Sequence, residues 1–110
     1  MRVTVSHDNN PQEIISSVDR GFDDMMRGLP LGPIQFANET RTWNGPRMDF
    51  AFTAKAGLLN VPIKGFVLVE QRQVTIDVDL PPLLSSFIPE QKLKTAVETQ
   101  ARALLGPAKV

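Results

Sequence analysis

The stretch from residue 61 to residue 84, VPIKGFVLVEQRQVTIDVDLPPLL, constrains the fold more than any other part of the chain. Apolar and polar residues alternate on both sides of a short polar segment, which is the pattern of two antiparallel strands joined by a tight turn. A register that pairs Val69 with Val74 gives both strands a common apolar face and sets Lys64 opposite Asp79 on the other face. This stretch therefore predicts a hairpin around which the other strands assemble.

Further strands and two helices are expected around this hairpin. The same alternation predicts strands at residues 2–7, 34–43 and 48–54. One helix begins at Asn10-Pro11, a capping residue followed by a proline at the first helical position, and ends before residues 28–33, which are rich in glycine and proline. Another follows Pro89, and residues 83–88 form at most a helical turn between prolines.

The sequence also predicts which residues pair across the middle strands, because the length of each connecting loop sets the register. At the Asn-Gly-Pro corner, a three-residue loop or a local bulge is favoured, which pairs Arg41 with Asp49 and leaves Trp43 on the outer face or at the rim. A four-residue loop after the next strand pairs Phe52 with Gly65, so that the ring covers the glycine.

The predicted fold class is α+β, with the order β-α-β-β-β-β-α. A curved antiparallel sheet packs on two helices, and the first strand lies beside the last. The 110 residues form one domain, residues 1–110, without a linker or an internal repeat. This architecture resembles a shortened helix-grip fold, and a likeness of architecture alone implies no function.

The amino-acid composition excludes or disfavours several classes of function. Twelve basic and twelve acidic residues give no net charge, which disfavours a nucleic-acid partner. The absence of cysteine excludes disulfides, thiolate nucleophiles and zinc–thiolate sites. No secretory signal or transmembrane segment is visible, because every apolar run is short. We expect a soluble cytoplasmic protein.

Few residues offer catalytic or metal chemistry. His7 is the single histidine, and we expect it at the surface where the first strand ends. Asp77 and Asp79 share a strand face and are suited to a hard cation or to acid–base work, but solvated residues beside Lys64 are the favoured interpretation. The segment Gly28–Pro33 carries prolines where a phosphate cradle needs free amides. We therefore assign no catalytic residue, cofactor or metal.

An apolar contact surface is the first candidate binding site. Phe66 and Leu68 fall on the outer face of the predicted sheet among polar residues, with Trp43 near them. The segment that ends in Phe87 and Ile88 is a second contact if these side chains are not tucked under the sheet. The ordinary alternative is that single apolar residues are scattered over the surface.

The space between the sheet and the helices is the second candidate site. It would hold a lipid-like ligand in a cavity of roughly a few hundred Å³, the scale of small-molecule sites. The favoured interpretation is that shorter strands close it as a packed core. Its expected lining is Phe22, Met25, Met26, Phe36, Phe50, Phe52, Val67 and Ile76.

The spacing of aromatic, glycine and proline residues resembles that of the small polyhydroxyalkanoic acid system protein family. The likeness covers nearly the whole chain but departs from the family in the proline-broken segment 81–89, where the family tends to continue as helix. The residues that carry it are Asp19-x-Gly21-Phe22, Trp43-x-Gly45, Phe50-x-Phe52, Val61-x-x-x-Gly65, Val74-x-Ile76-x-Val78, and Leu80-Pro81 followed by Leu83-Leu84.

This resemblance implies a bacterial, cytoplasmic protein encoded among genes for polyester storage granules, without assigned catalytic residues. The expected function is then that of a non-enzymatic accessory protein that binds a granule surface or a granule-associated protein through Phe66, Leu68 and Trp43. The alternative is a soluble carrier of a lipid-like or acyl ligand. A homodimer with stacked outer faces is a third interpretation, and an esterase or hydratase built on His7, Asp77 or Asp79 is the last.

Overall fold

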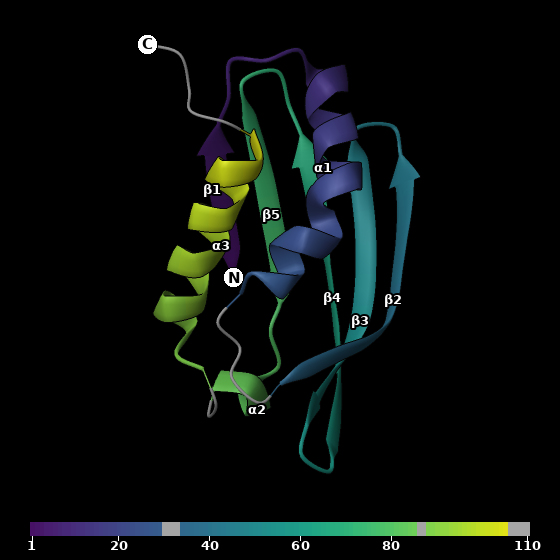
Figure 1. Cartoon of the computed structure of the whole chain (residues 1–110), viewed down its shortest axis with the longest axis vertical. Coiled ribbons are helices and arrows are strands. Elements are labelled where there is room, and N and C mark those ends of the chain that lie inside the picture. Colours follow the sequence, from purple (N-terminus) through teal and green to yellow (C-terminus); the bar gives the residue numbers. More distant parts are fainter. Residues whose placement is uncertain (30–33, 86–87, 106–110) are drawn as a thin grey trace.

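The structure is a computed structural model that describes residues 1–29, 34–85 and 88–105. It has two layers, a sheet and a pair of helices on one of its faces (Figure 1). The elements in chain order are β1 (Arg2–Ser6), α1 (Pro11–Arg27), β2 (Gln35–Asn44), β3 (Arg47–Ala56), β4 (Leu59–Val69), β5 (Gln73–Asp79), α2 (Pro82–Ser85) and α3 (Glu90–Leu105).

The sheet has five strands in the order β1-β5-β4-β3-β2, and each neighbouring pair is antiparallel. The predicted α+β class and element order are confirmed, as is the position of the first strand beside the last, where Val3 pairs with Ile76. The β4–β5 register is also as predicted, because Val69 pairs with Val74.

The predicted register between β3 and β4 is wrong by two residues. Gly65 pairs with Phe50 rather than Phe52, and a two-residue turn of Gly57 and Leu58 replaces the expected four-residue loop. Gly57 has φ of +64°, which suits the first central position of a type II′ turn, the tight turn that matches strand twist.

The corner between β2 and β3 is a tight turn, and a bulge interrupts β2 farther along the strand. Asn44 pairs with Arg47, so Gly45 and Pro46 form a two-residue turn instead of the three-residue loop. Gly45 has φ of +62°, and proline fixes the negative φ that the second position of a type II′ turn requires. Arg41 consequently pairs with Phe50 rather than with Asp49, so the predicted pairing is wrong, and the register shift between these strands lies between Ala37 and Thr40, away from the corner where a bulge was the predicted alternative.

Both long helices begin and pack as the sequence indicates. The Asn10 side chain accepts a hydrogen bond from the backbone N–H of Gln12 at 2.8 Å, and Pro11 opens α1. The short α2 is the single helical turn expected between the prolines. Gly21 of α1 faces the side chain of Leu104 on α3, so the missing Cβ permits close contact between the helices.

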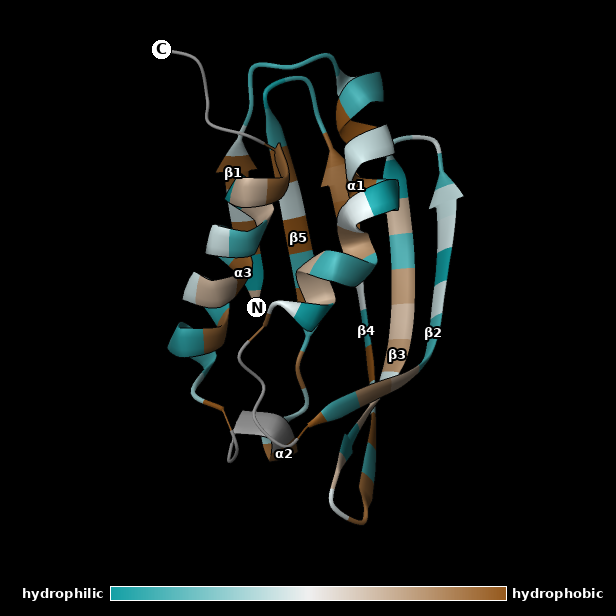
Figure 2. Ribbon diagram, in the orientation of Figure 1, coloured by the Kyte–Doolittle hydropathy of each residue, from teal (hydrophilic) through white to brown (hydrophobic). Residues whose placement is uncertain are grey.

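The core lies between the helices and the sheet and is formed by apolar residues of both layers. Figure 2 shows hydrophobic and hydrophilic positions alternating along the strands. Phe22 of α1 meets the edge of Phe50 at 5.1 Å between ring centroids, and the Phe36 and Phe52 rings meet at 4.6 Å. Edge-to-face contacts of this kind stabilise a core beyond simple burial. The opposite face of the sheet is not covered by either long helix (Figure 1).

Candidate functional site

Phe66 and Leu68 lie on the uncovered outer face of β4, as predicted. Phe66 pairs with Asp49 and Leu68 with Arg47 on β3, and both apolar side chains are half-buried. The Arg47 guanidinium lies over the Phe66 ring, with Cζ 4.0 Å from the ring centroid, and its Nη2 is 3.1 Å from Asp49 Oδ1. A cation over an aromatic face is a favourable contact that a partner must displace or share.

Charged side chains flank this apolar pair. Arg2 Nε donates to Asp77 Oδ2 at 2.9 Å, and Lys64 pairs across the strands with Asp79. The two aspartates therefore face separate basic neighbours rather than converging on one position. Asp77 thus forms an ion pair with Arg2, and Asp79 is an exposed residue across from Lys64, in line with the solvated residues that the sequence favoured.

Trp43 does not join Phe66 and Leu68, so its expected place on the outer face is wrong. It pairs with Met48, whose side chain is fully buried on the helix side of the sheet. The indole Nε1–H donates to Asp19 Oδ1 on α1 at 2.9 Å. Trp43 thus ties the edge strand β2 to the helix layer.

Arg41 continues this link between β2 and α1. Its guanidinium lies 5.9 Å from the Phe22 ring centroid, with Nε 3.8 Å from Asp19 Oδ1 and Nη1 3.8 Å from Asp23 Oδ1. Burial, a hydrogen bond with Asp23 and the Asp23 charge raise the pKa of the Glu39 carboxyl above its usual 4.5. The charges of Arg41 and Arg27 act in the opposite direction but do not cancel the rise in the pKa of Glu39.

His7 is buried rather than at the surface, with 2% of its surface exposed. The backbone N–H of Asn9 donates to His7 Nδ1 at 3.2 Å, so Nε2 carries the proton and donates to the carbonyl of Glu70 at 2.8 Å. Both ring nitrogens are engaged in backbone contacts. The histidine joins the end of β1 to the β4–β5 turn.

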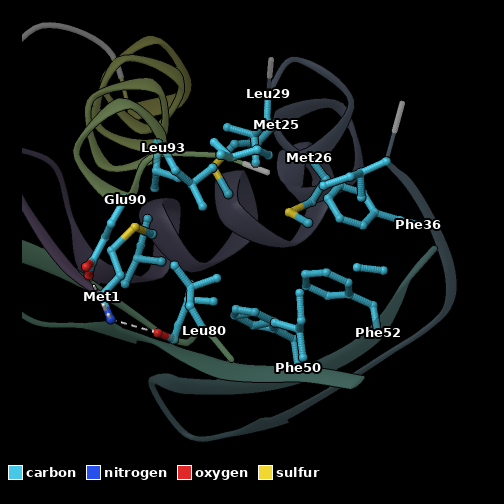
Figure 3. Close-up of a pocket in the computed structure, with 17 residues that line it drawn as sticks. Met1, Met25, Met26, Leu29, Phe36, Phe50, Phe52, Leu80, Glu90 and Leu93 are labelled. Atoms are coloured by element: carbon cyan, nitrogen blue, oxygen red, sulfur yellow. Dashed lines mark hydrogen bonds and ion pairs between the residues drawn. The ribbon is translucent and has the colours of Figure 1, made fainter. Parts of the chain in front are cut away.

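An apolar cavity of about 60 Å³ lies between α1, α3 and the sheet (Figure 3). Figure 3 shows Met25 and Met26 from α1 facing Phe50 and Phe52 from β3 across it. Its volume is well below the roughly 300 Å³ at which small-molecule sites begin. The expected lining is largely present, but a lipid-like ligand requires these side chains to move apart.

Met1 and Glu90 supply the polar groups at one side of this cavity. The terminal ammonium of Met1 donates to the Val78 carbonyl at 2.9 Å and lies 3.9 Å from Glu90 Oε1 (Figure 3). Ile88 lines the cavity and is half-buried against the core, so it does not form the second contact that the sequence suggested. Phe87 lies outside the described residues.

Sequence reasoning overlooked the most exposed large apolar side chains of the described residues. Leu58 is 102% exposed, Leu83 46% and Leu59 43%. The available signal was the pair of leucines inside the predicted loop of residues 57–60, because turns ordinarily carry glycine, asparagine or other polar residues.

Within the described ranges, no cluster of histidine, aspartate or glutamate is arranged to hold a metal ion, and no helix has the length and hydropathy of a membrane span. No protein-family model, curated protein or solved structure matches the chain.

Proposed function

We propose that this chain is a non-enzymatic accessory protein that binds an apolar surface, that of a polyester storage granule or of a protein attached to one. The observation that carries the proposal is the pair Phe66 and Leu68 on a sheet face that no long helix covers. Desolvating two large apolar side chains supplies the driving force for such contact. The polyester identity comes from the sequence resemblance described above.

The flanking charges favour reversible binding over tight adsorption. Arg47 already lies over Phe66, and Arg2 and Asp77 form an ion pair on the same face. These groups remain solvated when the protein is free, and they limit the apolar area that a partner can cover.

Co-sedimentation with native polyester granules tests this proposal. The purified protein should be retained beyond an equal-sized neutral control, and Phe66→Asp with Leu68→Asp should lower its partition by roughly tenfold or more. Thr4→Asp with Thr42→Asp is the matched control, because both threonines are exposed on the outer face of edge strands. Equal retention of the two folded double variants would contradict the assignment of the contact to Phe66 and Leu68, because the control threonines lie on the same face.

Carriage of a lipid-like or acyl ligand is the second candidate function. It is favoured by the cavity lined by Met1, Met25 and Met26, because unbranched thioether side chains rearrange readily around a ligand. Native mass spectrometry of the protein as isolated tests it. A bound ligand mass would support carriage, and a ligand-free protein that fails to take up a fluorescent fatty acid would contradict it.

A further inference from the structure

The exposed leucines of the described residues gather at one end of the molecule. Leu58 and Leu59 belong to the tip of the β3–β4 hairpin, and Leu83 belongs to α2. The hairpin tip and α2 both lie at the lower end of the long axis in Figure 1, and Figure 2 colours the tip as hydrophobic. This end, defined by Leu58, Leu59 and Leu83, is called the apolar end below.

The hairpin projects beyond the strands that flank it. The β4–β5 pairing extends only as far as Lys64, and the β2–β3 pairing only as far as Lys55. The last pair of the hairpin, Ala56 with Leu59, therefore lies outside both neighbouring ladders. The two-residue turn at Gly57 holds Leu58 at the point of the projection.

The backbone of this turn does not require a leucine. Gly57 supplies the positive φ, and the second position of the turn accepts polar residues as readily. The β4–β5 turn at the other end of the sheet has the same length and carries Gln71 and Arg72, both exposed. Leu58 is thus an apolar side chain held in solvent with no contribution to folding from its burial.

The charges of the hairpin indicate the chemistry of its partner. From Ala51 to Val69 the only ionisable side chains are Lys55 and Lys64. Lys55 and Asn60 pair across the strands just behind the tip, and both are exposed. The tip therefore offers apolar groups backed by hydrogen-bond donors, which complements a surface of hydrocarbon and carbonyl oxygens without donors.

We propose that the apolar end inserts into an aliphatic ester phase, the polyester itself, with Leu58 and Leu59 in the phase and Lys55 and Asn60 at its boundary. The inference rests on the proposed function and identifies the part of the chain that enters the polymer. A convex tip needs no preformed pocket, because chains of an amorphous polymer move aside for it. Lysine stems accompany such insertion while their ammonium groups stay in water.

A tryptophan placed at the tip measures insertion directly. The reporter is Leu58→Trp in a Trp43→Phe background, which leaves one tryptophan, and the matched control is Gln71→Trp in the same background. With protein-free polyhydroxybutyrate particles, the emission of the tip reporter should shift to shorter wavelength and lose its quenching by iodide. The control reporter should remain quenched. Equal quenching of both reporters on bound protein would overturn the proposal.

Leu58→Asp tests the same end by binding. Its partition onto protein-free polyester particles should fall by roughly tenfold, while Gln71→Asp should match the wild type.

If the wild-type protein binds and Leu58→Asp binds equally, insertion through the apolar end is wrong and granule binding stands. If the protein binds pure particles through Leu58 but not native granules, the insertion stands and the proposed granule function is wrong. Binding to phosphatidylcholine vesicles but not to polyester would overturn the ester-phase assignment.

Discussion

The ring of Phe50 on β3 lies over Gly65, its partner on β4. A Cβ atom at position 65 would lie 2.7 Å from Phe50 Cζ and would also collide with the backbone carbonyl of Asp77. The same ring meets Phe22 edge-on and stacks with Phe52 at 6.1 Å between centroids. Gly65 is therefore required for the packing of three aromatic rings against the sheet.

Gly65→Ala should lower the free energy of unfolding by about 1–3 kcal/mol, the usual cost of overpacking a core. The cost is near the upper end because one colliding group is backbone and cannot rotate away. Urea denaturation followed by circular dichroism measures it. Thr53→Ala on the outer face of the neighbouring strand is the control, and an unchanged midpoint for Gly65→Ala would contradict the close packing.

The sequence predicted which face each residue of β3 and β4 presents, but it did not predict the pairing. Side chains alternate with a period of two, so a register shift of two residues leaves the apolar faces matched. Phe52 and Phe50 were therefore equally compatible with Gly65. The turn at Gly57 and Leu58 decides between them, and its length is a matter of local backbone conformation.

His7→Leu should lower the free energy of unfolding by about 1–3 kcal/mol, because it leaves the Glu70 carbonyl and the Asn9 N–H without their partners. The apolar volume is nearly kept, so the loss reports the hydrogen bonds. Urea denaturation gives the stability, and hydrogen exchange at Asn9 should accelerate. Ser6→Ala, exposed on the same strand, is the control. Unchanged stability and exchange would refute this role for His7.

The alternation of side chains between the two faces of the sheet also made the candidate site predictable in part. Phe66 and Leu68 were assigned to the correct face by alternation alone. Trp43 was not, because a loop one residue shorter turns its side chain to the helix layer. The burial of His7 depends on the position of the distant Glu70 carbonyl, which no local pattern near His7 encodes.

Trp43→Phe should cost about 0.5–1.5 kcal/mol of stability, because it removes the indole donor to Asp19 and keeps most of the apolar contact. A double-mutant cycle with Asp19→Ala isolates the hydrogen bond from the Arg41 ion pair nearby. Additive losses in the cycle would show that the two side chains do not interact. Granule retention should be unchanged, because Trp43 lies on the face opposite Phe66.

Stability should fall as the pH rises through the titration of Glu39. Burial first, and then Asp23, raise the pKa of Glu39 above 4.5, so the folded protein keeps this proton at pH values where the unfolded chain has lost it. The unfolded state then binds fewer protons, and the free energy of unfolding decreases from pH 4.5 up to the raised pKa. The effect is small because the Glu39 carboxyl is only slightly withdrawn from solvent and most of the residue stays exposed.

Glu39→Gln removes this dependence, because glutamine does not ionise and keeps the hydrogen bonding of the position. The variant should gain stability over the wild type as the pH rises from 4 to 7, measured by urea midpoints at each pH. Added salt should weaken the contribution of the Asp23 charge. Glu13→Gln, an exposed carboxylate in the first turn of α1, is the control. A wild-type-to-variant difference that stays constant with pH would show that Glu39 does not hold its proton more tightly in the folded state.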